Sequence, residues 1–358
     1  MKSWTWVLLI LLVILIKWVS WYPGFVERNY TYGFYPVIAR VQRFLLGWIP
    51  FSLGDIFYSL LILFILYKFF RLIRTIVRRQ VNRRYLVGSM QQGIFFFLFL
   101  YVSFNFLWGL NYNRMGISPQ LGLDVKKYSL AELDTLTTHL QTRLNYFAGK
   151  VTPAQRDSFR KKSRVFDETV RAYATAAEKY PFLRYHTPSL KPSLFSYLGN
   201  YLGFQGYYNP FSGEAQVNTT IPGFLEPFVT AHEVAHQLGY GKENEANFVA
   251  FLACRNDSSQ VMNYSMYFDM YNYAINEMRR RDTARSRYFG KQLHPQVRED
   301  YATFIKFMWG HRSPVQPVVN WGYGHYLKAN NQPGGKETYN EVVAWLVAYY
   351  RKFGVEAL

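Results

Sequence analysis

The sequence predicts an α-helical membrane anchor with three transmembrane helices, followed by a mainly helical α+β domain. Two observations indicate this fold class. Long apolar segments are confined to the first 111 residues, and an HExxH motif lies in the remainder within a segment that carries helix signals. The chain has 358 residues, of which 50% are hydrophobic, enough for a substantial core in one or two domains. We expect a membrane domain over residues 1–111 and a soluble domain over residues 112–358.

Three apolar segments are long enough to cross a hydrocarbon layer of roughly 30 Å; they cover about residues 4–21, 51–70 and 93–110. A cleaved signal peptide is the alternative for the first, because Lys2 supplies a positive start. No small-x-small cleavage site follows before the bulky WYPGF, so an uncleaved span is expected. Residues 22–50 then form an interfacial hairpin or a surface packed on the later domain.

The basic loop RLIRTIVRRQVNRR between the second and third spans sets the expected orientation. Together with Lys68 it carries seven positive residues and no acid, so the positive-inside rule places it in the cytoplasm. The N-terminus is then cytoplasmic, and everything after about Asn111 lies outside. The net charge of +18 could also indicate a nucleic-acid partner, but topology already explains this loop. We expect contact with membrane lipid and none with nucleic acid.

Helix signals recur through the soluble domain. Ser129 and Glu132 form a potential capping box, and Thr152 opens a second helix that continues to about residue 180. Cys254 has no partner for an intramolecular disulfide, so we expect a buried thiol. After it, Met and aromatic residues recur at helical spacing, which is typical of a packed core, in SSQVMNYSMYFDMYNYAINEMRRR, HPQVREDYATFIKFMWG and ETYNEVVAWLVAYYRKF.

Residues 204–222 differ in character from the helical segments around them. Glycines, aromatic residues and β-favouring residues flank a turn over residues 209–213, which predicts a hairpin or an edge strand. This segment could be plain supporting structure. It could also bind an extended peptide by strand addition, through the part from Tyr207 to Asn218, because it precedes the HExxH helix.

The stretch HEVAH has the spacing of a zinc site. Glu226 and Pro227 can open a helix that places His232 and His236 on successive turns, about 40° apart around the axis. Both imidazoles would then point toward one ion at the roughly 2.0 to 2.1 Å that zinc accepts from nitrogen. Glu233 would hold and deprotonate a zinc-bound water, as general base and then acid.

A hydrolytic zinc site needs three protein ligands and one open position. On a continuous helix Glu243 would sit roughly 16 Å beyond His232, so the helix must stop first. Gly239 and Gly241 can provide the stop, because glycine readily adopts positive φ. The chain can then turn back into a second helix, ENEANFVAFLAC, whose first turn offers Glu243 as the third ligand and Glu245 as the alternative.

The surroundings of the motif favour a buried metal helix over a chance match. Apart from the residues of the motif itself, no charge or proline interrupts Val229 to Leu238. A bare HExxH also occurs by chance, and two surface histidines are the alternative. The sequence does not choose a side chain to steady the oxyanion of a tetrahedral intermediate; the candidates are His311, His325, Tyr323, Tyr326 and Tyr339.

Several segments together resemble one family: LLGWIPFSLGD, YYNPFSGEAQVN, TAHEVAHQLGYGKENEANF and the closing YLKANNQ. They look like a family of bacterial membrane proteins described only as a domain of unknown function, with a zincin-type metallopeptidase signature, and the likeness covers nearly the whole chain. It implies a zincin-like domain with His232, Glu233 and His236 in the usual positions. Glu243, followed three residues later by Ala246, also resembles the third-ligand helix of glutamate-type zinc peptidases.

We therefore expect an integral protein of the bacterial cytoplasmic membrane whose extracytoplasmic domain hydrolyses peptide bonds of an envelope protein or peptide, with Zn²⁺ as cofactor. One alternative is a non-catalytic membrane scaffold with a structural or degenerate zinc site. A second is an intramembrane protease, but its HExxH would lie within a span, whereas this motif lies between polar segments. The sequence identifies neither the substrate-binding residues nor the oligomeric state.

Overall fold

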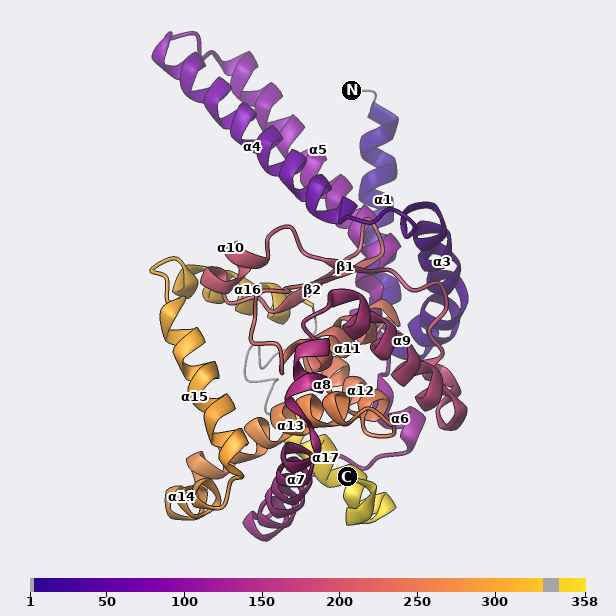
Figure 1. Cartoon of the computed structure of the whole chain (residues 1–358). Coiled ribbons are helices and arrows are strands. Elements are labelled where there is room, and N and C mark those ends of the chain that lie inside the picture. Colours follow the sequence, from indigo (N-terminus) through magenta and orange to yellow (C-terminus); the bar gives the residue numbers. More distant parts are fainter. Residues whose placement is uncertain (1–2, 331–340) are drawn as a thin grey trace.

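The computed structural model describes residues 3–330 and 341–358. It is mainly helical with one small mixed sheet (Figure 1). Three of its described helices are long and apolar enough to cross a membrane: α1 (Ser3–Ser20), α4 (Leu53–Val77) and α5 (Arg83–Leu107). Most of their apolar side chains are exposed to the surroundings, as expected for surfaces that face lipid rather than a protein core.

The three expected apolar helices are present, with bounds that differ from those expected. The second continues to Val77 and the third begins at Arg83 and ends at Leu107, so the expected basic loop is reduced to residues 78–82. The reason is local: Arg and Lys are good helix formers and extend each helix beyond its apolar part. Asn82 caps the start of α5 with its side chain.

The segment between the first two spans packs on the later part of the chain rather than forming an isolated hairpin. It consists of α2 (Pro23–Phe25), a π-helix η1 (Val26–Phe34) and α3 (Tyr35–Leu46). From α3, the Tyr35 hydroxyl donates to the Gln237 carbonyl at 2.6 Å, and Gln42 donates to the Pro210 carbonyl at 2.9 Å. Of the two expected alternatives, the packed surface is the one observed.

After α5, short helices η2 (Gly109–Asn113) and α6 (Ile117–Leu121) lead into the helical body. The capping box at Ser129 and Glu132 is confirmed and starts α7 (Leu130–Lys150). The expected second helix is wrong in one respect, because it is split into α8 (Pro153–Ser158) and α9 (Lys162–Lys179). Phe159 is buried at this break, and burial of its aromatic ring stabilises the interrupted form.

The remaining helices enclose the core. They are α10 (Ser196–Leu202), α11 (Glu226–Gln237), α12 (Glu243–Cys254), α13 (Gln260–Arg281), α14 (Thr283–Lys291), α15 (Pro295–Gly310), α16 (Gln316–Ala329) and α17 (Glu341–Phe353), with the short helices η3 (Pro181–Leu183) and η5 (Val355–Ala357). The core surrounds α12, every residue of which is buried. Cys254 is free and buried, as expected.

The sheet has the order β1-β3-β2. β2 (Gly206–Asn209) and β3 (Glu214–Val217) form the expected antiparallel hairpin, with Gly206 opposite Val217. β1 (Leu190–Pro192) was not expected and pairs in parallel with β3. β3 therefore lies in the centre, and β2 is an edge strand that packs on α11.

Two buried carboxylates attach the start of α4 to this sheet. Glu214 of β3 accepts hydrogen bonds from the backbone N–H groups of Leu53 and Gly54, at 3.2 and 2.8 Å. Asp55 accepts one from the backbone N–H of Leu194 at 2.6 Å. Negative charge is favoured at a helix N-terminus because the first N–H groups lack helical partners. The contacts hold one end of a candidate span against the sheet.

Candidate metal centre

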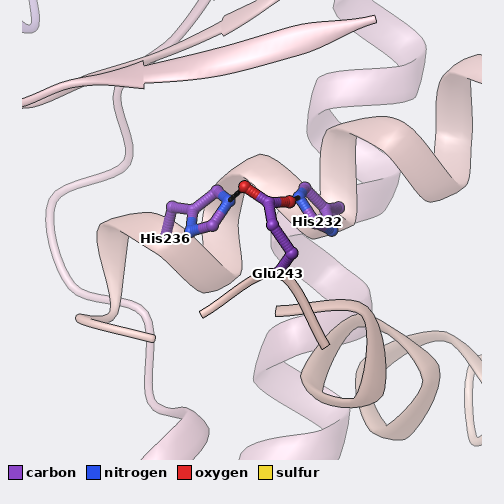
Figure 2. Close-up of side chains that lie close together, drawn as sticks. All are labelled: His232, His236 and Glu243. Carbon is purple, nitrogen blue, oxygen red and sulfur yellow. Dashed lines mark ion pairs between the residues drawn. The ribbon is translucent and has the colours of Figure 1, made fainter. Parts of the chain in front are cut away.

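The HExxH segment lies on α11, as the sequence predicted. Pro227 stands in the first turn, where its missing N–H costs no hydrogen bond. Every residue of α11 except His232 is classed as buried, which explains the absence of charge around the motif. His232 and His236 project from the same face of the helix toward Glu243 (Figure 2).

A glycine turn brings Glu243 back to the two histidines. Gly239 has φ +87°, the left-handed conformation that ends many helices at little cost for glycine. Gly241 has a different role: an added Cβ would lie 3.0 Å from Cδ1 of Tyr112, so glycine is needed there for close approach. α12 then begins at Glu243.

The three side chains form a compact donor set. Nε2 of His232 lies 3.2 Å from one carboxylate oxygen of Glu243, and Nε2 of His236 lies 3.8 Å from the other. All three potential ligand atoms lie within 4.8 Å of one another. Two imidazole nitrogens and one carboxylate oxygen are a ligand set that zinc accepts, so these residues could hold a metal ion.

Both imidazoles are oriented by hydrogen bonds at their other nitrogen. Nδ1 of His232 lies 2.9 Å from Oδ1 of Asn247, and Nδ1 of His236 lies 2.7 Å from the carbonyl oxygen of Tyr240. Each acceptor favours the tautomer with the proton on Nδ1 and leaves Nε2 as the metal-binding atom. Asn247 therefore supports the site; in the sequence it stands within TAHEVAHQLGYGKENEANF, one of the segments that carry the family resemblance.

Glu245, the alternative third ligand, is occupied elsewhere. Its carboxylate lies against Gly116, where an added Cβ would be 1.9 Å from Oε1, and Oε1 is 3.8 Å from Nζ of Lys242. It is not part of the cluster that His232, His236 and Glu243 form among the described residues. The geometry thus supports Glu243 over Glu245.

Glu233 is buried and faces the same cavity as the two histidines. Its Oε2 atom has no hydrogen-bond partner among the described residues. Gly206 of β2 lies directly against it, since a Cβ at that position would be 2.5 Å from Oε1 of Glu233. A buried carboxylate oxygen with no protein partner is free to accept a proton or a hydrogen bond from a bound molecule.

Burial and the charges of neighbouring side chains set the pKa values of the site residues. Burial raises the pKa of Glu233 to about 8, with the charge of Glu243 adding to the effect. Burial alone would also raise the pKa of Glu243, but its hydrogen bond to His232 and its electrostatic interactions with the two histidines lower it to about 2. Burial lowers the pKa of His236 to about 4. Glu243 is therefore ionised and His236 neutral, which are the forms that bind a cation. Burial lowers the pKa of His232, but its hydrogen bond to Glu243 and the charges of Glu243 and Glu233 raise it to about 9, so His232 must release a proton when a cation binds.

The cluster opens into a cavity of about 620 Å³. Its wall includes Asp269 and Tyr273 of α13, which sequence reasoning missed. Asp269 is half-buried, one of its oxygens has no hydrogen-bond partner among the described residues, and burial raises its pKa to about 7. The available signal was a single acid inside the apolar and aromatic pattern of MNYSMYFDMYNY.

The candidates for oxyanion stabilisation separate by position. The Tyr323 hydroxyl donates to Glu243 at 2.5 Å and, like Tyr326, lines the cavity. His311 and His325 instead bond through Nδ1 to carbonyl oxygens of their own helices or flanking turns. Tyr339 lies outside the described residues.

Comparison with known proteins identifies one family. The family described as "Protein of unknown function (DUF3810)" matches residues 30–347. The chain belongs to this family. The DUF3810 match includes α4, α5, the sheet and the whole His232, His236 and Glu243 cluster. No curated protein and no solved structure matches the chain.

Proposed function

We propose that this DUF3810 protein is a membrane-anchored zinc metallopeptidase that hydrolyses peptide bonds of an envelope protein or peptide outside the cytoplasm. One observation carries the proposal: the Glu243 carboxylate lies between two Nε2 atoms whose imidazoles are fixed through Nδ1. His232, His236 and Glu243 would hold the ion. A bound zinc ion would polarise the peptide carbonyl and lower the pKa of a water molecule to about 7.

Glu233 supplies the proton-transfer group. Glu233 follows His232 directly on α11 and precedes His236 by three residues. It faces the cavity, and one of its oxygens has no hydrogen-bond partner among the described residues. A buried carboxylate is suited to take a proton from water and return it to the leaving amine. We therefore assign the general base, and then the general acid, to Glu233.

The edge strand β2 supplies a binding site for an extended chain. Gly206, Tyr207 and Tyr208 of β2 all line the cavity, and one side of β2 is paired with β3. A substrate strand added to the other side would gain backbone hydrogen bonds. The contact between Gly206 and Glu233 would bring that strand alongside the proposed base, which favours a polypeptide substrate.

The test uses the full-length protein in detergent, with zinc content and hydrolysis of a mixed peptide library as readouts. Glu233→Gln should retain stoichiometric zinc and lose activity by about 10²- to 10⁴-fold, because only the proton-transfer group changes. His232→Ala should lose zinc. Glu226→Gln is the matched control: it changes the same chemical group on the same helix, outside the cavity, and should remain active.

Undiminished hydrolysis by Glu233→Gln would refute the assignment. If the site were only structural, as in the scaffold alternative, Glu233→Gln would have no effect on any readout while His232→Ala would unfold the protein. The two variants together therefore separate an enzyme from a scaffold.

A further inference from the structure

Helix α16 has two faces of different character. Asn320, Tyr323 and Tyr326 line the metal-site cavity. Val318 and Trp321, which are three residues apart and share the other face, are 66% and 67% exposed. α16 is therefore a wall of the cavity whose outer side carries large, mostly exposed apolar side chains.

The exposed apolar surface continues onto neighbouring elements. α10 contacts α16, and the ring of Tyr201 on α10 lies 5.0 Å from that of His311 at the end of α15. We call the whole surface the interfacial face; it is formed by Leu194, Tyr197, Leu198, Trp309, Val318 and Trp321, all more than half exposed. Exposed apolar side chains gathered on adjacent elements are typical of an interaction site.

The two segments that carry the interfacial face contain basic residues and no acidic ones. Residues 179–213, which include α10, contain no aspartate or glutamate, and neither do residues 301–336, which include α16. The second segment contributes Lys306, Arg312 and Lys328. Apolar and aromatic side chains flanked by basic residues without acids match the surface of an anionic bilayer, where Trp and Tyr are enriched.

The position of the face matches that of the candidate spans. The cavity behind α16 is also lined by Tyr58 of α4 and Phe104 of α5, so α16 and the ends of two candidate spans border one cavity. In Figure 1, α10 and α16 lie on the side of the body from which α4 and α5 project. A bilayer crossed by these helices would pass close to that side.

We propose that the interfacial face binds the lipid surface of the membrane that α1, α4 and α5 cross. This second attachment holds α16, a wall of the metal-site cavity, next to the bilayer. One consequence rests on the proposed peptidase function. The substrate would be a membrane-anchored polypeptide, cleaved at a segment close to the substrate's membrane anchor, rather than a freely diffusing peptide.

Single cysteines labelled with an environment-sensitive fluorophore test the lipid contact. Cys254 is wholly buried, and burial raises the pKa of its thiol, so it will not react. Val318→Cys and Trp321→Cys are placed in full-length protein, which is reconstituted into phosphatidylglycerol and phosphatidylethanolamine vesicles containing nitroxide-labelled lipid. The control is Tyr288→Cys on α14, where the tyrosine is 49% exposed on the side of the body away from α4 and α5 (Figure 1).

Quenching of the labels at 318 and 321 should be several-fold stronger than at 288, and the difference should disappear in detergent without nitroxide lipid. Equal quenching at all three positions would overturn the proposal. The measurement needs neither zinc nor hydrolysis. If Glu233→Gln protein is inactive but the labels are still quenched, the lipid contact is supported independently of the peptidase function. If the protein is active but the labels are not quenched, only the lipid contact is contradicted.

Discussion

Gly206 lies against Glu233 so closely that no side chain fits between them. An added Cβ would be 2.5 Å from Oε1 and 2.8 Å from Cγ of Glu233. Gly206→Ala must therefore displace the carboxylate. We expect hydrolysis to fall by about 10²-fold, the effect of misplacing a catalytic group by about 1 Å, with zinc content unchanged because no ligand is touched.

The control for that substitution is Gly223→Ala. An added Cβ at Gly223 meets nothing within 4 Å, so activity should equal that of the unaltered protein. If Gly206→Ala were as active as Gly223→Ala, Glu233 would not be the proton-transfer group, or β2 would not border the reacting bond.

Glu226 makes the stability of the protein depend on pH, independently of the candidate metal ligands. Burial raises the pKa of Glu226 to about 7 from an ordinary value of 4.5. The folded state then holds this proton more tightly than the unfolded state, so the contribution of Glu226 to stability falls as the pH rises from about 4.5 to about 7 and is constant above. Glu226→Gln removes this dependence.

Thermal unfolding in detergent measures the effect. The midpoint of Glu226→Gln, relative to the unaltered protein, should be higher at about pH 8 than at about pH 5. A relative midpoint that is the same at both values would show that the Glu226 carboxyl titrates normally in the folded protein.

At the level of elements, the start of α4 depends on a carboxylate from the sheet. Glu214→Ala leaves the N–H groups of Leu53 and Gly54 buried without their acceptor. A lost partner of this kind costs about 1–3 kcal/mol, so the unfolding midpoint should fall measurably. Glu178→Ala, which removes an exposed glutamate on α9, should have no effect, and equal midpoints for the two variants would contradict this role for Glu214.

Elements with local signals could be predicted from the sequence, and those set by distant partners could not. Ser129 and Glu132 predict the start of α7, because both partners of a capping box lie within four residues of sequence. β1 has only three residues, ends at Pro192 and exists through its pairing with β3. Nothing in its own sequence indicates a strand, since its stability comes from a partner about 25 residues away.

The candidate site shows the same division. The spacing of the histidines and the glycine break predict the His232, His236 and Glu243 cluster, because helix geometry and positive φ at Gly239 are local properties. Asp269 enters the cavity from α13, and only tertiary packing places it there. The bounds of α4 and α5 were also missed, since basic residues continue a helix past its apolar part.

On the scale of the whole molecule, the basic residues at the joined ends of α4 and α5 predict the orientation. Arg74, Arg78, Arg79, Arg83 and Arg84 lie around this connection, so the positive-inside rule places it in the cytoplasm. Alkaline phosphatase, which is active only outside the cytoplasm, should be active when fused after Leu358 and inactive when inserted at residue 80. If only the form inserted at residue 80 were active, the predicted orientation would be wrong and the candidate metal centre would lie inside the cell.

The C-terminal end of α11 is completed by side chains from the membrane-proximal part of the chain. Trp108 donates to the carbonyl of His236 at 2.9 Å, and Tyr35 donates to that of Gln237 at 2.6 Å. A chain clipped at residue 111 would lose both donors and fray the helix that carries the metal ligands. Under the proposed function, release of residues 112–358 from the first part of the chain would therefore abolish metal binding and hydrolysis, and the activity would be confined to the membrane that holds the spans.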